Sequence, residues 1–197
     1  MQLSVTAVLL ATLAAAVHGD LIEHFESGMG DYWVSWSDDN GGHWVWKNTS
    51  LMEVPQRPAG SEGVTMLIPD EGRVSAAGHL YSPLFAFPAG AKISAIFNRF
   101  SYWIRSQWVG SANLILKLVE NGQEDLPFLD LSSFAAPDND QWRQAEAEVP
   151  SSRYEQTRIC VFGYRANHDL DAIAVDDIVL TGVDGSQVRL PLSPNME

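Results

Sequence analysis

The stretch Ile173-Ala174-Val175-Asp176-Asp177-Ile178-Val179-Leu180 sets two adjacent acidic residues inside an otherwise apolar run. Because successive side chains of a β-strand point to opposite faces, one carboxylate is expected on each face. Regular alternation sorts the apolar residues into two sets, Ile173, Val175 and Val179 on one face and Ala174, Ile178 and Leu180 on the other. At least one carboxylate is then buried or half-buried, where it needs N–H donors, a basic side chain or a cation. We interpret the run as a structural clasp rather than a catalytic site.

The N-terminal segment has the features of a secretory signal. An apolar run from Val8 to Val17 precedes the first charged side chain, Asp20, and is shorter than the about 20 residues that a membrane span needs. Small residues at both ends of Val17-His18-Gly19 predict cleavage after Gly19. We expect residues 1–19 to be a signal peptide and the protein to be secreted, without a membrane span or lipid anchor. The alternative is a core helix, but the run lacks a polar face.

Charge and cysteine content restrict the partners and the chemistry. The formal net charge of −13 argues against nucleic acid and anionic lipid, because no basic surface is evident. Cys160 is the single cysteine, so no intramolecular disulfide forms, and its apolar surroundings predict a small core residue. An intermolecular bridge or a reactive thiol is the alternative. Asn48-Thr49-Ser50 is a glycosylation sequon, which predicts a surface loop modified at Asn48.

Short β-rich runs, separated by Gly, Pro, Asn and Asp, recur along the whole chain after the signal segment. The expected strands cover residues 64–68, 79–84, 92–104, 113–119, 142–149, 158–164 and 172–181. Many short strands at this spacing predict an all-β fold, a two-sheet antiparallel jelly-roll sandwich. We expect one domain over residues 20–183 and a C-terminal tail over residues 184–197.

The order of several weak motifs resembles that of a MAM domain, the extracellular module of meprins, neuropilins and receptor tyrosine phosphatases of the mu type. The resemblance extends over residues 20–183. The residues that carry it are Phe25-Glu26-Ser27-Gly28 with Trp33, Asp38-Asp39 with Trp44, Leu80-Tyr81-Ser82-Pro83, Phe97 to Tyr102, Leu114 to Val119, Trp142-Arg143, Val161-Phe162-Gly163-Tyr164 and Ala174-Val175-Asp176-Asp177-Ile178.

The chain also departs from the MAM pattern. MAM domains usually carry paired cysteines, whose partners are absent here, and a lost disulfide typically forgoes about 2–4 kcal/mol. The module is usually one part of a larger receptor or protease. The resemblance therefore implies the fold, whereas the adhesive or signalling roles of the family transfer poorly to this chain.

The two ends of the domain also resemble carbohydrate-binding jelly rolls, in which an early Phe-Glu-x-Gly…Trp element and a late Asp-Asp strand flank a structural calcium. Ca²⁺ takes about six to eight oxygen ligands, and the first and last strands of such sandwiches lie close together. Glu26 with Asp176 or Asp177 is therefore the candidate calcium set. The alternative is that these acids cap turns or accept backbone N–H bonds. Either arrangement pins the first strand to the last.

Catalysis is not supported by the sequence. Glu146 and Glu148 share one strand face, as a glycosidase pair would, but they share it with Gln144, while Ala145, Ala147 and Val149 point the other way. That pattern is typical of an ordinary half-exposed strand. No nucleophile elbow, zinc motif or phosphate-binding glycine loop is present.

Seven tryptophans are candidates for the core or for a ligand surface. Most are expected in the core, especially Trp44 and Trp142. Trp103 and Trp108 flank residues 104–107, which are expected to form a loop, so these two are the predicted exposed pair that contacts a ligand.

These observations predict a secreted, non-enzymatic recognition or adhesion domain that binds an extracellular protein or a second copy of itself. The alternative is a lectin-like module that binds glycans through Trp103, Trp108 or the cluster between Trp33 and Trp46.

Overall fold

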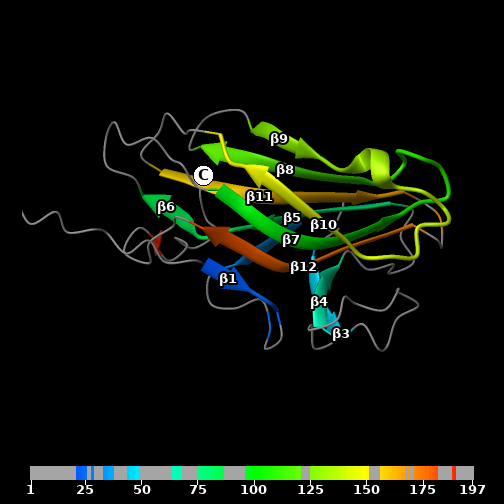
Figure 1. Cartoon of the computed structure of the whole chain (residues 1–197), viewed down its shortest axis with the longest axis horizontal. Coiled ribbons are helices and arrows are strands. Elements are labelled where there is room, and N and C mark those ends of the chain that lie inside the picture. The colour runs from blue at the N-terminus through cyan, green and yellow to red at the C-terminus, as the bar shows by residue number, and fades with distance from the viewer. Residues whose placement is uncertain are drawn as a thin grey trace, which may run out of the picture.

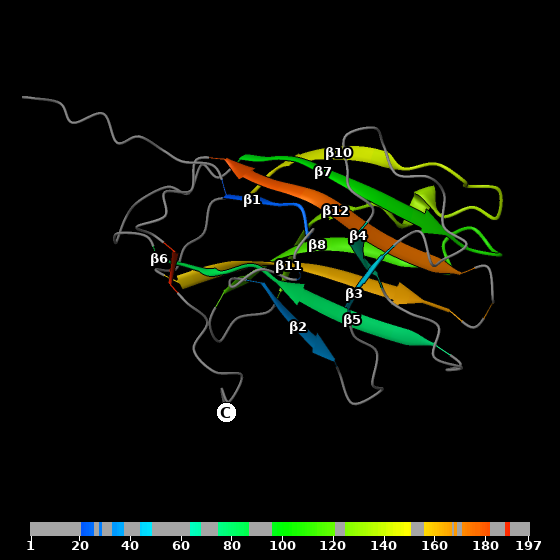
Figure 2. The ribbon, with the colours of Figure 1, turned by 90° about the horizontal axis from the view of Figure 1, so that it is seen from below.

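The chain folds into two antiparallel β-sheets packed face to face (Figures 1 and 2). The computed structural model describes residues 21–25, 28, 33–37, 44–48, 64–67, 75–86, 96–120, 125–150, 156–166, 168, 171–181 and 188–189. Within these residues the only helical segment is the 3-10 turn η2 (Ser132–Phe134). The expected all-β sandwich is confirmed.

The six-stranded sheet holds both ends of the predicted clasp. Its order is β10 (Arg143–Glu148), β7 (Ile96–Arg105), β12 (Ala172–Thr181), β4 (Val64–Leu67) and β3 (Val45–Asn48), and β1 (Leu21–Glu23) also pairs with β12. β4 pairs with Ala174 and Val175, whereas β1 pairs with residues 178–180, opposite Glu23 to Leu21. β1, the first strand, therefore lies beside β12, the strand that carries Asp176-Asp177 (Figure 2), as predicted.

The seven-stranded sheet is built around β11 (Gln156–Arg165). The path runs β13 (Val188–Arg189), β6 (Leu84–Ala86), β11, β5 (Ala76–Tyr81) and β2 (Val34–Ser37), while β8 (Asn113–Glu120) pairs with β11 and with β9 (Leu126–Asp130). β13 lies inside the segment predicted as a tail.

The Ser82-Pro83 pair explains how β5 and β6 follow one edge of β11 in succession. The N–H of Ser82 donates to the carbonyl of Ile159 at 2.9 Å, and the Ser82 hydroxyl accepts the N–H of Ile159 at 2.9 Å. Proline has no N–H of its own, so the serine side chain completes the pairing where the strand breaks.

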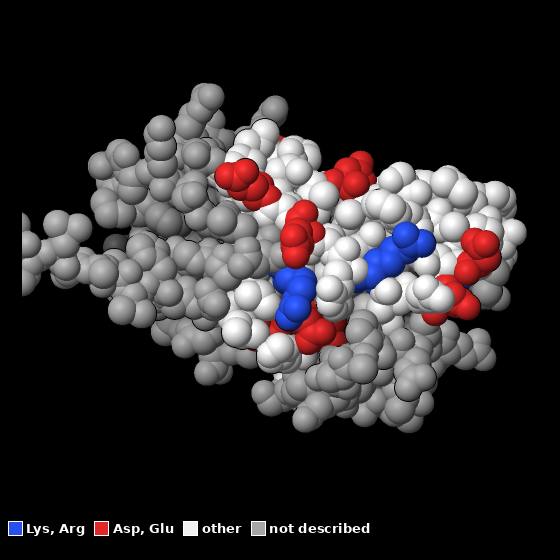
Figure 3. Space-filling model, in the orientation of Figure 1, with Lys and Arg blue, Asp and Glu red and all other residues white. Residues whose placement is uncertain are grey.

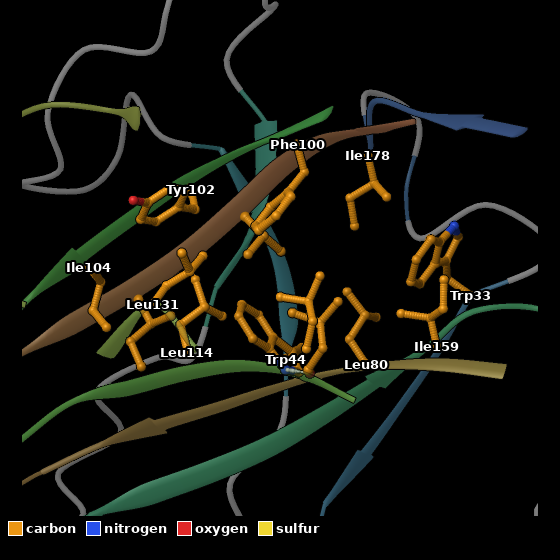
Figure 4. Packing of buried hydrophobic residues seen from close by; sticks show 14 of the residues in the cluster. Trp33, Trp44, Leu80, Phe100, Tyr102, Ile104, Leu114, Leu131, Ile159 and Ile178 are labelled. Atoms are coloured by element: carbon orange, nitrogen blue, oxygen red, sulfur yellow. Dashed lines mark hydrogen bonds between the residues drawn. The ribbon is translucent and has the colours of Figure 1, made fainter. Parts of the chain in front are cut away.

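Alternating side chains define the core between the sheets. On β8, Leu114, Leu116 and Leu118 are buried in the core, whereas the residues between them face the outside of the sandwich. Side chains from both sheets point toward one another in Figure 4.

Trp44, just before β3, joins the two sheets. Its ring is 1% exposed, and its Nε1–H is shared between the carbonyls of Gly78 on β5 at 3.0 Å and Val161 on β11 at 3.1 Å. The predicted core position of Trp44 is confirmed. Trp142 is half-buried and packs with Trp103 and Ala174 in a smaller cluster outside the main core.

Candidate functional site

The Asp176-Asp177 pair forms a β-bulge, which corrects the regular alternation predicted for this strand. Ile173, Val175, Ile178 and Leu180 all lie in the main core, so the interval between Val175 and Ile178 is three residues instead of two. The register of β12 against β7 shifts between Asp176 and Val179, and Asp177 has a φ of 50°. Aspartate tolerates this left-handed conformation better than most residues. The extra residue changes which face the following side chains occupy.

The carboxylate of Asp177 contacts two of the three segments that lie beside β12. Its Oδ1 lies 2.8 Å from Nδ1 of His24, which follows β1, and its Oδ2 accepts the hydroxyl of Ser101 on β7 at 3.3 Å. Asp176 is 1% exposed, and its Oδ1 accepts the N–H of Asp177 at 2.8 Å. The bulge therefore ties the last long strand to β1 and β7.

The predicted calcium set is only partly described by the structure. Glu26 lies outside the described residues, and within them no group of three or more His, Cys, Asp or Glu side chains is arranged to hold a metal. One carboxylate oxygen of Asp177, Oδ1, is already hydrogen-bonded to the His24 ring.

The predicted glycosylation site begins at Asn48, the last residue of β3, which pairs with Val64 of β4. The other two residues of the sequon lie outside the described residues.

The structure separates the two tryptophans that were predicted to be exposed together. The prediction is wrong for Trp103, which is 1% exposed. Ile104 and Arg105 belong to β7 rather than to a loop, so Trp103 points from a strand toward Ala174 and Trp142, and its Nε1 donates to the carbonyl of Asn139 at 3.0 Å. Trp108, in contrast, is 61% exposed, and its neighbour Val109 is 71% exposed.

Trp108 and Val109 are held on a tight turn between β7 and β8, which we call the Trp108 turn (residues 106–111). The N–H of Ser111 donates to the carbonyl of Trp108 at 3.1 Å, and Gly110 has a φ of 80°. A positive φ at the third position, with this bond, is the geometry of a type II turn, which favours glycine there. The ring of His168 stands edge-on to Trp108, with centroids 5.9 Å apart.

A buried carboxylate fixes the base of the Trp108 turn. Asp171 is 3% exposed, and its Oδ1 accepts the Ser106 hydroxyl at 2.7 Å and the N–H of Gln107 at 2.9 Å. The Ser111 hydroxyl lies within reach of two acceptors, Ser106 Oγ and the carbonyl of Trp108 at 2.8 Å, and its single hydrogen is donated to one of them. Two exposed apolar side chains are thereby held in a defined position.

A second surface, not anticipated from the sequence, covers the outer side of the seven-stranded sheet. Strand register places Trp36 opposite His79, His79 opposite Phe162 and Phe162 opposite Ile115 in one row across four strands. The next row contains Tyr81, Cys160 and Lys117. We call this surface the aromatic face (Trp36, His79, Tyr81, Lys117, Arg158 and Phe162).

The rings of the aromatic face contact one another and carry two cations. The His79 ring lies 5.0 Å from that of Phe162 and stacks on that of Tyr81 at 6.0 Å. Lys117 Nζ lies 4.5 Å from the Phe162 ring centre, and the Arg158 guanidinium lies 4.1 Å from that of Tyr81. Trp36 is 46% exposed. No described strand or turn lies over this face (Figure 2).

Cys160 lies beneath the aromatic face and is buried, as predicted. Burial raises the pKa of its thiol to about 12, and burial also raises the pKa of the Tyr81 hydroxyl to about 12. Both groups are therefore neutral near neutral pH, and the thiol is not a nucleophile. In the sequence, the alternation of His79 with Tyr81 on β5 was the signal that these rings share one face. Only the pairing of β5 with β11 brings them beside Phe162.

Glu146 and Glu148 lie exposed on the edge strand β10. A pair of surface carboxylates on a sheet edge gives no support to a glycosidase centre, which requires a cleft around the scissile bond.

No helix in the described part of the chain is long and apolar enough to cross a membrane.

The fold is shared with bacterial adhesin domains. The K1 cleaved adhesin domain of Lys-gingipain from Porphyromonas gingivalis W83 superposes with a TM-score of 0.57 at 18% identity, covering 85% of this chain and 99% of that domain. The K3 domain of the same protein gives 0.51 at 20% identity, covering 82% and 97%. TmCBM61, solved with β-1,4-galactotriose, gives 0.49 at 15% identity, covering 80% and 93%.

The sequence profile of the MAM domain (meprin/A5/mu) matches residues 24–184. The chain belongs to the MAM family. A comparison with curated proteins found no match. The predicted resemblance is confirmed, and this MAM domain has a single, buried cysteine. Membership of the MAM family supports the coarse expectation of an adhesion-type module.

Proposed function

We propose that this MAM domain is a secreted, non-enzymatic recognition domain that binds an extracellular protein or a second copy of itself, with the Trp108 turn as the anchor. The observation that carries the proposal is the pair Trp108 and Val109, the two most exposed large apolar side chains among the described residues. Exposed tryptophan is enriched at the centres of protein interfaces.

The hydrogen bonds beneath the turn support this role energetically. An anchor that is ordered before binding does not lose its conformational entropy in the complex. The bonds from Asp171 to Ser106 and Gln107 provide that order. The chain's net charge of −13 disfavours anionic membranes, and two apolar side chains bury too little area to hold a lipid surface without basic neighbours.

The test compares a Trp108→Ser/Val109→Ser variant with the native chain. Sedimentation velocity over a range of concentrations measures self-association, and a panel of extracellular domains measures binding to other proteins. We expect one of the two interactions in the native chain and at least about a tenfold loss in the variant. Trp36→Ala, which removes an exposed indole on the aromatic face, is the control and keeps the interaction. A native chain that stays monomeric and binds no protein contradicts the proposal.

A second candidate function, carbohydrate recognition, is favoured by the aromatic face. Partly exposed rings on a rigid sheet, interspersed with N–H and O–H groups, suit the mixed apolar and polar surface of a sugar. Trp36 belongs to the tryptophan cluster that the sequence put forward for this role, whereas Trp103 is buried and takes no part.

A further inference from the structure

We propose that the aromatic face binds an acidic oligosaccharide, which stacks on the row from Trp36 through His79 to Phe162 and directs an anionic group sideways to Arg158, whose guanidinium lies over Tyr81 of the neighbouring row. The inference deepens the carbohydrate alternative of the proposed recognition function. It is independent of the Trp108 turn.

The row has the shape of an extended binding site. Trp36, His79, Phe162 and Ile115 are register partners on neighbouring strands, and strands lie about 4.8 Å apart, so the row spans about 14 Å. That length exceeds one sugar ring. Within the row, the rings of His79 and Phe162 contact each other, and Lys117 lies over Phe162. The apolar C–H face of a pyranose can stack on such rings while its hydroxyls reach polar atoms at their sides.

The charges on the aromatic face favour an acidic ligand. Among the described residues Arg158 has no carboxylate partner, and its guanidinium lies over the Tyr81 ring. Lys117 pairs with Asp125 at 3.4 Å, and the acid Asp130 lies at the far end of the row, opposite Ile115. The net charge of −13 opposes anions at long range, so any attraction has to be local. A half-buried arginine without a carboxylate partner among the described residues provides such a local attraction for one anionic group.

On the opposite face of the sandwich the Arg105 guanidinium lies 4.9 Å from the ring centre of Trp103, but that ring is 1% exposed and offers little stacking surface. Figure 3 shows the outer side of the six-stranded sheet, where Asp and Glu side chains surround the few Lys and Arg side chains. Glu146 and Glu148 are exposed on β10, an edge strand of that sheet. An acidic ligand is repelled by that side and is therefore expected on the aromatic face.

A sugar fits the aromatic face better than an acidic peptide does. Of the large apolar side chains in the described part of this face only Trp36 is strongly exposed, and the other rings are half-buried between polar groups. Protein interfaces usually bury about 800 Å² per partner around an apolar centre. The half-buried rings of the aromatic face can stack on a sugar ring, but they do not form the large apolar centre that a protein interface needs.

Calorimetric titration with two matched hexasaccharides tests the inference. The acidic probe alternates glucuronate with N-acetylglucosamine, and the neutral probe contains N-acetylglucosamine alone. We expect the native chain to bind the acidic hexasaccharide, more weakly at high salt, and to bind glucuronate monosaccharide and the neutral hexasaccharide at least about tenfold more weakly.

Three variants locate the site. Trp36→Ala should weaken binding of the acidic hexasaccharide about tenfold, and Arg158→Gln should abolish the preference for the acidic probe. Trp46→Ala is the matched control, because Trp46 is 47% exposed on β3 of the other sheet, and it should bind as the native chain does. Melting temperatures verify that all three variants are folded.

Several outcomes overturn the inference: no binding of the acidic hexasaccharide, equal binding of the neutral one, equal binding of poly-glutamate, or an equal loss in Trp46→Ala. The Trp108→Ser/Val109→Ser variant should bind the sugar normally. If the sugar fails to bind while a protein interaction depends on Trp108, only this inference is lost, and the proposed protein recognition stands.

Discussion

Glu23, at the end of β1, combines a structural hydrogen bond with a costly charge. Its Oε1 accepts the N–H of Phe25 at 2.9 Å, which fixes the chain where it leaves the strand. Burial raises the pKa of its carboxyl above the ordinary 4.5, although the bond from Phe25 and the nearby His24 act in the opposite direction. The folded chain therefore holds this proton more tightly than the unfolded chain.

The raised pKa predicts a pH-dependent cost that Glu23→Gln removes. Since the native chain loses stability as the pH rises from 4.5 through the raised pKa, the variant should gain stability relative to it over that window and keep the gain at neutrality. The glutamine oxygen can still accept the Phe25 N–H. Urea unfolding of both proteins at a series of pH values measures the difference. A difference that is constant with pH contradicts the prediction.

At the scale of the element, the bulge in β12 depends on the left-handed backbone of Asp177 and on the hydrogen bonds that its side chain accepts. With φ at 50°, a residue with an ordinary Cβ is strained, whereas glycine and asparagine adopt this conformation readily. We expect Asp177→Asn to cost less than about 1 kcal/mol and Asp177→Ala to cost about 1 kcal/mol more than Asp177→Gly. Urea unfolding measures all three. Equal costs for alanine and glycine would show that the backbone at the bulge is not strained.

The Asp177 variants also test whether Ca²⁺ binds at the bulge. A cation held through Asp177 raises the melting temperature of the native chain when Ca²⁺ replaces EDTA, because the ligand binds only the folded state. Asp177→Asn should then lose most of that shift. If Ca²⁺ and EDTA give the same melting temperature, the contacts of Asp177 with His24 and Ser101 hold the strands without a cation.

At the scale of the whole molecule, Trp44 connects the two sheets of a domain whose single cysteine forms no intramolecular disulfide. Trp44→Phe keeps an aromatic ring but removes the N–H shared by the Gly78 and Val161 carbonyls and leaves unfilled volume. We expect the free energy of unfolding to fall by about 2–4 kcal/mol. Urea unfolding monitored by far-UV circular dichroism measures this loss. Trp108→Phe, at an exposed ring, should change it by less than about 0.5 kcal/mol. Similar effects of the two substitutions would contradict the bridging role.

Much of the fold could be predicted from alternation and turn residues, while the candidate surfaces could not. Leu114, Leu116 and Leu118 alternate with polar or outward residues, so β8 and its core face follow from local spacing. Trp103 and Trp108 differ in exposure because β7 ends at Arg105, so Trp103 lies in the strand and Trp108 lies beyond it. The amino acids between the two tryptophans do not indicate where the strand ends. Strand ends depend on partners, and the partner of residues 101–105 is β12, about 70 residues away.

By itself, the sequence determined the sandwich, the burial of Cys160, the family and the meeting of the first strand with the strand that carries Asp176-Asp177. The sandwich and the burial of Cys160 follow from side-chain periodicity, whereas the family and the meeting of those two strands follow from the resemblance of the ordered motifs. Only the tertiary structure decided that Asp176-Asp177 is a bulge, that Asp171 supports the Trp108 turn, and that Trp36, His79 and Phe162 form one row. The physical reason is register: pairing between distant strands sets which side chains become neighbours, and a one-residue shift moves them to opposite faces.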